Sequence, residues 1–215
     1  YAGKVEDCGA WMDSLHKENS DMCMGISEYG ADTNVQYHSD APKRQDYTEE
    51  YQSYYHEKML QAIQERPYLW CSFVWNMFDF AADARDQGGE PGMNHKGLMT
   101  FDRKVKKDSF YIYKAYWSKE PFVHLCGSRY VDRTEAVTTV KVYSNQTKVA
   151  LYANGKLLEE KTGNKVFEFR VPLNGEVRLE AVSGQAKDTS TIRRVSQPNP
   201  DYKLKKSKGK SQNWV

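Results

Sequence analysis

Glu28 is the side chain in this sequence that is best placed for chemistry. It follows the largely apolar run 22–27 and precedes Gly30, which breaks the run. A short apolar run of this kind predicts a strand buried on both faces, as the strands of parallel sheets are. Ligands bind at the carboxyl ends of such strands, so a carboxylate there is a candidate catalytic group. The position by itself leaves open a solvated carboxylate or a helix cap.

A tryptophan stands near the end of a second apolar run, one helix further along the chain. The helix is predicted over 48–66, because a threonine N-cap and two acids open it and Pro67 ends it. The run 68–80 then predicts a second buried strand that carries Trp75. Strand, helix and strand form a βαβ unit, so we expect Trp75 and Glu28 at one rim of a parallel sheet.

Two further helices and two loops are expected to hold these side chains in place. Acids at the start and apolar residues at helical spacing predict a helix over 6–17, and another is expected over 108–117, capped by Asp108. The polar stretch 34–47 has no periodicity, and 81–93 is rich in Gly, Asp and Pro. Both stretches are predicted to be loops, the first of them overhanging the strand end.

The hydrophobic pattern changes from helical to alternating at Phe122, which marks a predicted domain boundary. Asn154-Gly155 between two alternating runs is a strong hairpin signal. Short strands with turns between them and no helix fit an immunoglobulin-like β-sandwich. Its strands are expected over 137–144, 148–153, 156–158, 166–171, 176–182 and 189–195. The predicted division is therefore an α/β part over 1–121, an all-β sandwich over 122–196 and a basic linker or tail over 197–215.

Composition and charge exclude several classes of function. The chain has 215 residues, of which 39% are hydrophobic, and this is enough for a core. Its 31 basic and 29 acidic side chains give a net charge of +2, so no nucleic-acid partner is expected. No apolar run approaches the roughly 18 residues of a membrane span, so no membrane partner is expected either. The four cysteines form no C-x-x-C pair, and neither a disulfide framework nor a metal site is predicted.

The sequence opens on Tyr1 rather than Met, and we expect it to be a piece of a longer protein. No signal peptide opens it, which for such a piece leaves the compartment open. A cytoplasmic location is favoured over a periplasmic or secreted one.

Three stretches of the sequence resemble the catalytic domain of one enzyme family. The stretches are 26–32 around Glu28, 74–81 around Trp75, and 92–104, which contains Asn94 and Lys96. In this order they are similar to the last part of the catalytic barrel of glycoside hydrolase family 2, the β-galactosidase and β-glucuronidase family. The resemblance covers 1–121 and implies the last two β/α units of a TIM barrel. The β region after it is similar to the sandwich that follows the barrel in β-galactosidases of this group.

The resemblance implies a retaining exo-glycosidase that acts on a carbohydrate substrate by double displacement, with no cofactor. In this mechanism one carboxylate attacks the anomeric carbon, and a second carboxylate, about 5 to 5.5 Å away, acts as general acid and then as base. Glu28 matches the family's nucleophile, and Trp75 matches the aromatic wall of the sugar pocket. Asn94 and Lys96 match an asparagine-x-lysine pair placed at the substrate in glucuronidases.

One part of the family's pattern is missing. The family's acid/base glutamate follows an asparagine, and no Asn-Glu pair occurs in the sequence. We therefore expect the acid/base group outside this sequence and no activity from the chain alone. An exo-acting β-galactosidase is the favoured interpretation of the parent, because of the sandwich and tail after the barrel. A β-glucuronidase, which Asn94 and Lys96 permit, and a non-catalytic carbohydrate-binding module stay open, as does a homo-oligomer of the full-length parent.

Overall fold

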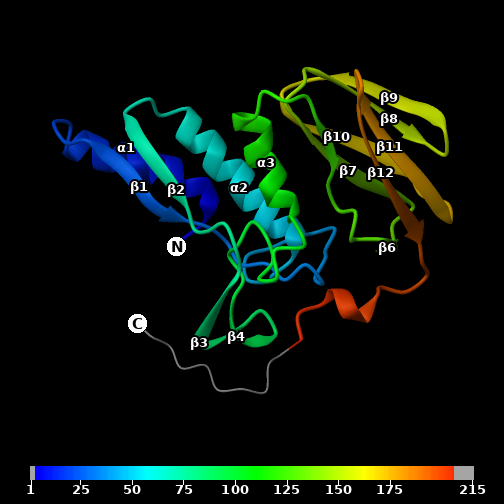
Figure 1. The fold of residues 1–215 in the computed structure, drawn as a ribbon, viewed down its shortest axis with the longest axis horizontal. Helices are drawn as coiled ribbons and strands as arrows, with labels where there is room; N and C mark the ends of the chain where they lie inside the picture. Colours follow the sequence, from blue (N-terminus) through cyan, green and yellow to red (C-terminus); the bar gives the residue numbers. More distant parts are fainter. Residues whose placement is uncertain (1–2, 206–215) are drawn as a thin grey trace.

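The computed structural model describes residues 3–205 and has a helical half followed by a half made of strands (Figure 1). This order confirms the predicted change from α/β to all-β. Residues 206–215, which belong to the predicted basic tail, lie outside the described part. The elements of the first half are η1 (Val5–Asp7), α1 (Cys8–Glu18), β1 (Met24–Tyr29), α2 (Glu49–Gln64), β2 (Leu69–Val74), β3 (Phe80–Gln87), β4 (Glu90–Asn94) and α3 (Asp108–Trp117).

Strands β1 and β2 pair in parallel, and α2 connects them, which confirms the predicted βαβ unit. Tyr29 at the end of β1 pairs with Val74 at the end of β2, so the two carboxyl ends are adjacent. The N-cap of α2 is the predicted one, because the Thr48 side chain accepts a hydrogen bond from the backbone N–H of Tyr51. Strand β2 is shorter than expected, since it ends at Val74 and the chain turns at Trp75.

The prediction of a loop over 81–93 is wrong. This stretch belongs to the antiparallel hairpin β3–β4, in which Phe80 pairs with Asn94. The tip residues Gly88 and Gly89 have φ angles of 71° and 78°, which glycine adopts readily, so they form the turn of this hairpin. The hairpin projects from the body of the molecule (Figure 1), and neither of its faces is buried in a core. Such strands need no apolar alternation, which is why the sequence pattern does not reveal them.

The second half forms two sheets that share one apolar core. Their strand orders are β10-β7-β5 and β6-β12-β11-β8-β9. Val142 from the first sheet and Leu151 from the second are fully buried in the same cluster. Asn154 and Gly155 have φ angles of 51° and 78°, as a tight hairpin requires. Each predicted strand is present, and the observed strands are β5 (Val123–Leu125), β6 (Asp132–Arg133), β7 (Val137–Ser144), β8 (Lys148–Ala153), β9 (Lys156–Thr162), β10 (Lys165–Pro172), β11 (Glu176–Ser183) and β12 (Ala186–Arg194).

The two halves pack closely against each other. Helix α3 lies against β7 and β10, and α2 packs on α3 (Figure 1). Tyr143 of β7 belongs to the same buried cluster as Leu60 of α2 and Ile112 of α3. Glu57 of α2 accepts hydrogen bonds from the ammonium of Lys141, at 2.7 Å, and from the hydroxyl of Tyr143. Apolar and charged contacts therefore both join the halves.

The chain after β12 returns to the helical half. A short 3₁₀ turn, η2 (Pro200–Tyr202), follows the last strand. The carbonyl of Tyr202 accepts a hydrogen bond from the backbone N–H of His38 at 3.0 Å, and its hydroxyl accepts one from the backbone N–H of Val131 at 3.2 Å. The first residues of the predicted linker are thus packed against the body of the protein.

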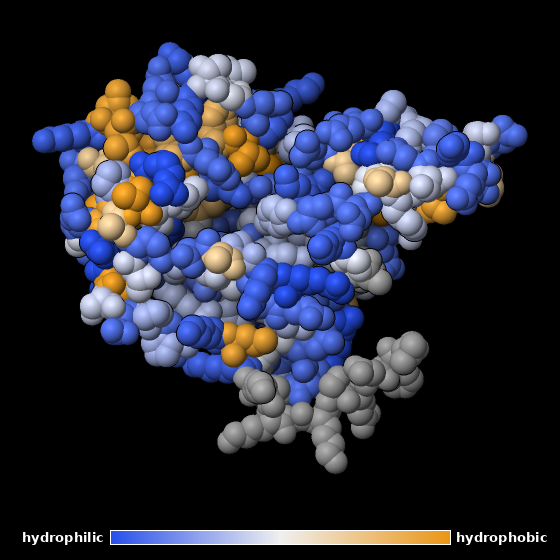
Figure 2. All heavy atoms as spheres, turned by 180° about the vertical axis from the view of Figure 1, so that it is seen from behind, coloured by the Kyte–Doolittle hydropathy of each residue, from blue (hydrophilic) through white to orange (hydrophobic). Residues whose placement is uncertain are grey.

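Some large apolar side chains stay on the surface. Met22, Trp70 and Phe73 are 64%, 71% and 58% exposed, so residues 3–205 leave part of the β1–β2 pair uncovered. Seen from behind, apolar residues also gather over the β half (Figure 2). Within the described range, no helix combines the length and the apolar character that crossing a bilayer requires.

Candidate functional site

Glu28 and Trp75 lie at adjacent strand ends. Glu28 is the penultimate residue of β1 and is exposed, and Trp75 directly follows β2. The backbone N–H of Trp75 donates to the carbonyl of Tyr29 at 2.8 Å, which ties the two ends together. The indole meets the ring of Phe80 edge-on, with 5.8 Å between the centroids, and the peptide between Trp75 and Asn76 is cis. The parallel pair therefore presents a carboxylate and an indole at one rim.

The hairpin returns the chain so that Asn94 and Lys96 lie beside the turn at Trp75. The backbone N–H of Asn76 donates to the carbonyl of Lys96 at 3.2 Å. Asn94 is buried, and its Oδ1 accepts a hydrogen bond from the backbone N–H of Lys96 at 3.0 Å, which fixes this turn. Gly30 is needed for the close approach, because a Cβ there would lie 2.0 Å from the carbonyl oxygen of Trp75. The segments that carry all four predicted site residues therefore meet at one rim.

An ion pair that the sequence patterns do not reveal holds the Lys96 side chain. Its Nζ lies 2.6 Å from Oδ2 of Asp32, and both side chains are mostly buried. The other oxygen of Asp32 accepts a hydrogen bond from the backbone N–H of His95 at 3.2 Å. Asp32 follows Glu28 by four residues, and that closeness is the signal that could have pointed to it. The pair holds a cation at a defined position beside the rim.

A fully buried lysine, Lys107, joins the segments next to the rim. Nζ of Lys107 lies 2.7 Å from Oδ1 of Asp79 and 3.1 Å from each of the carbonyl oxygens of Thr33 and His95. Oδ1 of Asp79 also accepts a hydrogen bond from the backbone N–H of Gly97 at 2.9 Å. Burial lowers the pKa of the Lys107 ammonium, and the Asp79 carboxylate opposes that shift. Lys107 closes a run of basic residues in the sequence, and nothing there distinguishes it from its solvated neighbours.

A cavity of about 310 Å³ opens next to Lys96. The loop after β1, helix α2 and strand β3 all contribute to its wall. The wall combines aromatic rings, cations and one carboxylate: Tyr47, Tyr51, Tyr55, Arg44, Arg85, Lys96 and Asp32. Two of the wall's tyrosines, Tyr51 and Tyr55, belong to α2. Aromatic faces stack on sugar rings, and cations bind carboxylates, so the wall is suited to an acidic sugar.

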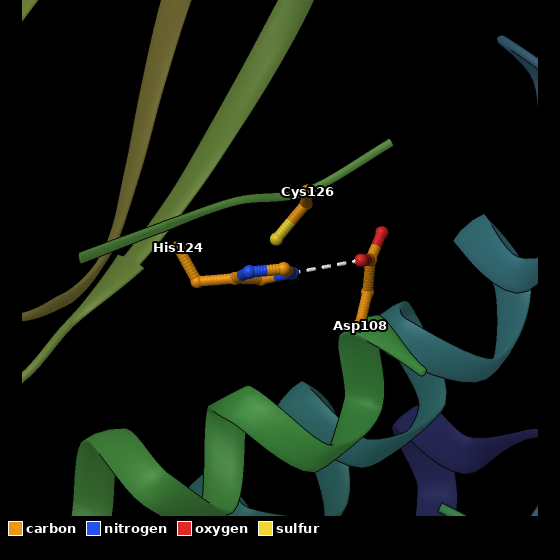
Figure 3. A group of neighbouring side chains, drawn as sticks. All are labelled: Asp108, His124 and Cys126. Carbon is orange, nitrogen blue, oxygen red and sulfur yellow. Dashed lines mark hydrogen bonds and ion pairs between the residues drawn. The ribbon is translucent and has the colours of Figure 1, made fainter. Parts of the chain in front are cut away.

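A second polar cluster lies where α3 meets β5 (Figure 3). It contains Asp108, His124 and Cys126, whose potential ligand atoms lie within 4.8 Å of one another. Nε2 of His124 lies 2.9 Å from Asp108, and its Nδ1 lies 3.4 Å from Asp188. The second oxygen of Asp108 accepts a hydrogen bond from the backbone N–H of Gly127 at 2.6 Å.

These contacts favour a buried ion-pair cluster over a metal site. Burial opposes the charge on His124, but hydrogen bonds to Asp108 and Asp188 outweigh it and raise the pKa of His124 to about 9. Both ring nitrogens of His124 face carboxylates, so the imidazole acts here as the ion-pair partner of Asp108 and Asp188. Burial also raises the pKa of the Cys126 thiol. The prediction that Asp108 caps α3 is wrong, because its carboxylate takes part in this cluster instead.

Comparison with known proteins finds relatives over most of the chain. A β-glucuronidase of Bacteroides fragilis is 40% identical over 161 residues, which are 72% of this chain. The structure of an FMN-binding β-glucuronidase from Faecalibacterium prausnitzii L2-6 is 50% identical and covers 95% of this chain with a TM-score of 0.93. A structure from Bacteroides fragilis, described as a candidate β-galactosidase, is 37% identical and covers 93% with a TM-score of 0.83. No family model matches.

The chain is much shorter than these relatives. It spans 23% of the length of the Bacteroides fragilis β-glucuronidase and 32% of each of the two structures. The similarity therefore concerns only the corresponding part of each relative.

Proposed function

Because this chain belongs to glycoside hydrolase family 2, the β-glucuronidase and β-galactosidase family, we propose that it is the nucleophile-bearing part of a retaining β-glucuronidase. Its substrates are carbohydrates that end in a β-linked glucuronic acid. A second catalytic carboxylate and the rest of the sugar pocket come from a longer protein of which this chain is a part.

The proposed architecture is the last two β/α units of a TIM barrel, over 1–121, followed by an immunoglobulin-like sandwich over 122–196. The parallel β1–β2 pair, connected through α2, supports the barrel. The exposed Trp70 and Phe73 support it as well, because neighbouring strands and helices of a closed barrel would cover them. Two sheets around one apolar core support the sandwich.

The observation that favours a glucuronide over a galactoside is the charge beside the rim. Three cations and one carboxylate line the cavity next to Lys96. A β-glucuronide carries a carboxylate where a β-galactoside carries a neutral hydroxymethyl group, so surplus positive charge favours the glucuronide. Two of the three relatives named above are described as β-glucuronidases, which agrees with this choice. We therefore propose β-glucuronidase activity in place of the β-galactosidase activity that the sequence analysis favours.

In the proposed reaction Glu28 attacks the anomeric carbon and forms a covalent glycosyl ester, while the acid/base group protonates the departing oxygen. Water, deprotonated by the same acid/base group, then releases the sugar from Glu28. Trp75 offers its indole face to the C–H face of the sugar. Asn94 and Lys96 bind the sugar carboxylate, and Asp32 holds the ammonium of Lys96 in position.

Activity on paired substrates tests the proposal. The longer protein that contains this chain should hydrolyse p-nitrophenyl β-D-glucuronide with a kcat/KM at least about tenfold above that for the β-D-galactoside, as one charged contact implies. The chain alone should hydrolyse neither substrate. Glu28→Gln should abolish hydrolysis but keep glucuronate binding, because the geometry stays while the nucleophile is lost. A fluorinated glucuronide that traps the ester should label the peptide that contains Glu28.

The matched control is Asp21→Asn, which removes an exposed carboxylate in the turn before β1, at the other end of the strand from Glu28. It should leave kcat/KM unchanged. Near-normal turnover by Glu28→Gln, or a label on another carboxylate, would remove Glu28 from this role. A higher kcat/KM for the galactoside would restore the β-galactosidase.

A further inference from the structure

Two arginines, Arg44 and Arg85, line the cavity. Lys96 in the same wall has Asp32 at 2.6 Å. Arg85, in contrast, donates from Nη1 to the uncharged Oε1 of Gln87 at 3.1 Å. Within residues 3–205, neither Arg85 nor Arg44 lies within ion-pair distance of a carboxylate. Two guanidinium charges of this cavity are therefore left for a ligand to neutralise.

The loop that carries Arg44 is held in an unusual conformation. Gln45 and Tyr47 have φ angles of 70° and 58°, in the left-handed region that side chains other than glycine rarely adopt. The carbonyl of Tyr47 accepts hydrogen bonds from the hydroxyl of Thr33 and the backbone N–H of Asn34, both at 3.0 Å. These bonds fix the loop where it forms the cavity wall.

Tyr47, Asp32 and Arg85 all line this wall. Burial raises the pKa of the Tyr47 hydroxyl, the Asp32 carboxylate raises it further, and Arg85 opposes both. Tyr51 and Tyr55 of α2 add two more rings to the wall. A guanidinium binds a planar carboxylate through two parallel hydrogen bonds, and the tyrosine rings suit a flat or ring-shaped group beside it.

We propose that Arg44 and Arg85 form a second anion subsite, which binds a carboxylate on the group that is linked to the glucuronic acid. The inference rests on the proposed glucuronidase function, in which the uronate itself lies at Asn94 and Lys96. The preferred substrates are therefore doubly anionic glucuronides, such as the ends of acidic oligosaccharides. A neutral aglycone leaves the two guanidinium charges of the subsite unused.

Calorimetric titration of the longer protein that contains this chain, carrying Glu28→Gln so that the ligands are not hydrolysed, tests the subsite. The three ligands are phenyl β-D-glucuronide, 4-carboxyphenyl β-D-glucuronide and 4-carboxyphenyl β-D-galactoside. The doubly anionic glucuronide should bind about tenfold more tightly than the phenyl glucuronide, as expected for a partly exposed charged contact. Arg85→Gln and Arg44→Gln should each remove most of this advantage and weaken the phenyl glucuronide much less, because its uronate gains only the general attraction of the cavity's positive charge. Lys43→Gln, which removes an exposed cation of the same loop outside the cavity wall, should change none of the three affinities.

The other outcomes separate the two proposals. Equal losses for both glucuronides in Arg85→Gln would assign Arg85 to the uronate and overturn the second subsite. Equal affinities of the Glu28→Gln protein with both arginines in place for both glucuronides, or no measurable binding of the doubly anionic one, would also overturn it. If the carboxyphenyl galactoside binds as tightly as the matching glucuronide and loses affinity in Arg85→Gln, the subsite stands and the glucuronide preference fails. Arg85→Lys, which keeps the charge, should retain part of the advantage and separates loss of charge from misfolding.

Discussion

The charge on His124 should control how the stability of this chain depends on pH. The imidazole bridges Asp108 of α3 and Asp188 of β12, at 2.9 and 3.4 Å, and so joins the helical half to the β half. Its pKa is raised from 6.5 to about 9 in the folded chain. A raised histidine pKa means that the folded state holds the proton more tightly than the unfolded state. The stabilisation is therefore fully present below about pH 6.5 and disappears as the pH rises through about 9.

The size of the effect follows from the shift. The difference between a pKa of 6.5 and one of about 9 corresponds to about 3 kcal/mol of folding free energy. The same linkage leaves about 2 kcal/mol at about pH 7.5 and well under about 1 kcal/mol at about pH 9. The lowered pKa of Asp108 reflects the same ion pair and is not added to this figure.

Urea unfolding of the chain and of His124→Gln, between about pH 6 and pH 9.5, measures this contribution. Glutamine keeps a hydrogen-bond donor near Asp108 but carries no charge. The unmodified chain should exceed the variant by about 3 kcal/mol at the acid end, and this difference should shrink steadily toward the alkaline end. Lys148→Gln, which removes a positive charge from an exposed ion pair with Glu160, controls for net charge. A difference that stays constant across the pH range would refute the charge-based explanation.

Three further predictions concern the rim and the halves. In the longer protein, Trp75→Ala should raise KM for an aryl glucuronide about tenfold, because the indole no longer stacks on the sugar. A large fall in melting temperature with an unchanged KM would instead indicate that Trp75 is a packing residue. Lys107→Met should lower the free energy of unfolding by about 3 kcal/mol or more, because it leaves the Asp79 carboxylate buried without its cation. Urea unfolding measures this loss, and Lys106→Met, which removes an exposed lysine, is the control. Under trypsin, 122–195 should survive longest because that part closes around its own core, which mass mapping of the fragments tests. Survival of a core around Glu28 while the β half is digested would contradict the last prediction.

The local patterns of the sequence predict most of the secondary structure. Helix α3 begins and ends where expected, β7 and β8 have their predicted bounds, and Asn154-Gly155 forms the predicted hairpin turn. These features depend on neighbours within a few residues, since periodicity and turn chemistry act locally. The hairpin β3–β4 escapes prediction because neither of its faces packs into a core, so no alternation is required of it.

The candidate site also has a part that local sequence patterns predict and a part that they do not. Glu28 and Trp75 can be placed at one rim from the sequence, because a parallel βαβ unit brings the ends of its two strands together. By itself the sequence therefore determines the order of elements, the alternation of the β half and which strand ends could carry chemistry. Only the tertiary structure pairs Lys96 with Asp32, buries Lys107 against Asp79 and brings Arg85 to the cavity beside Lys96. The two ion pairs join residues that lie far apart along the chain, and side chains at such separations meet only through the packing of whole elements, which no local pattern encodes.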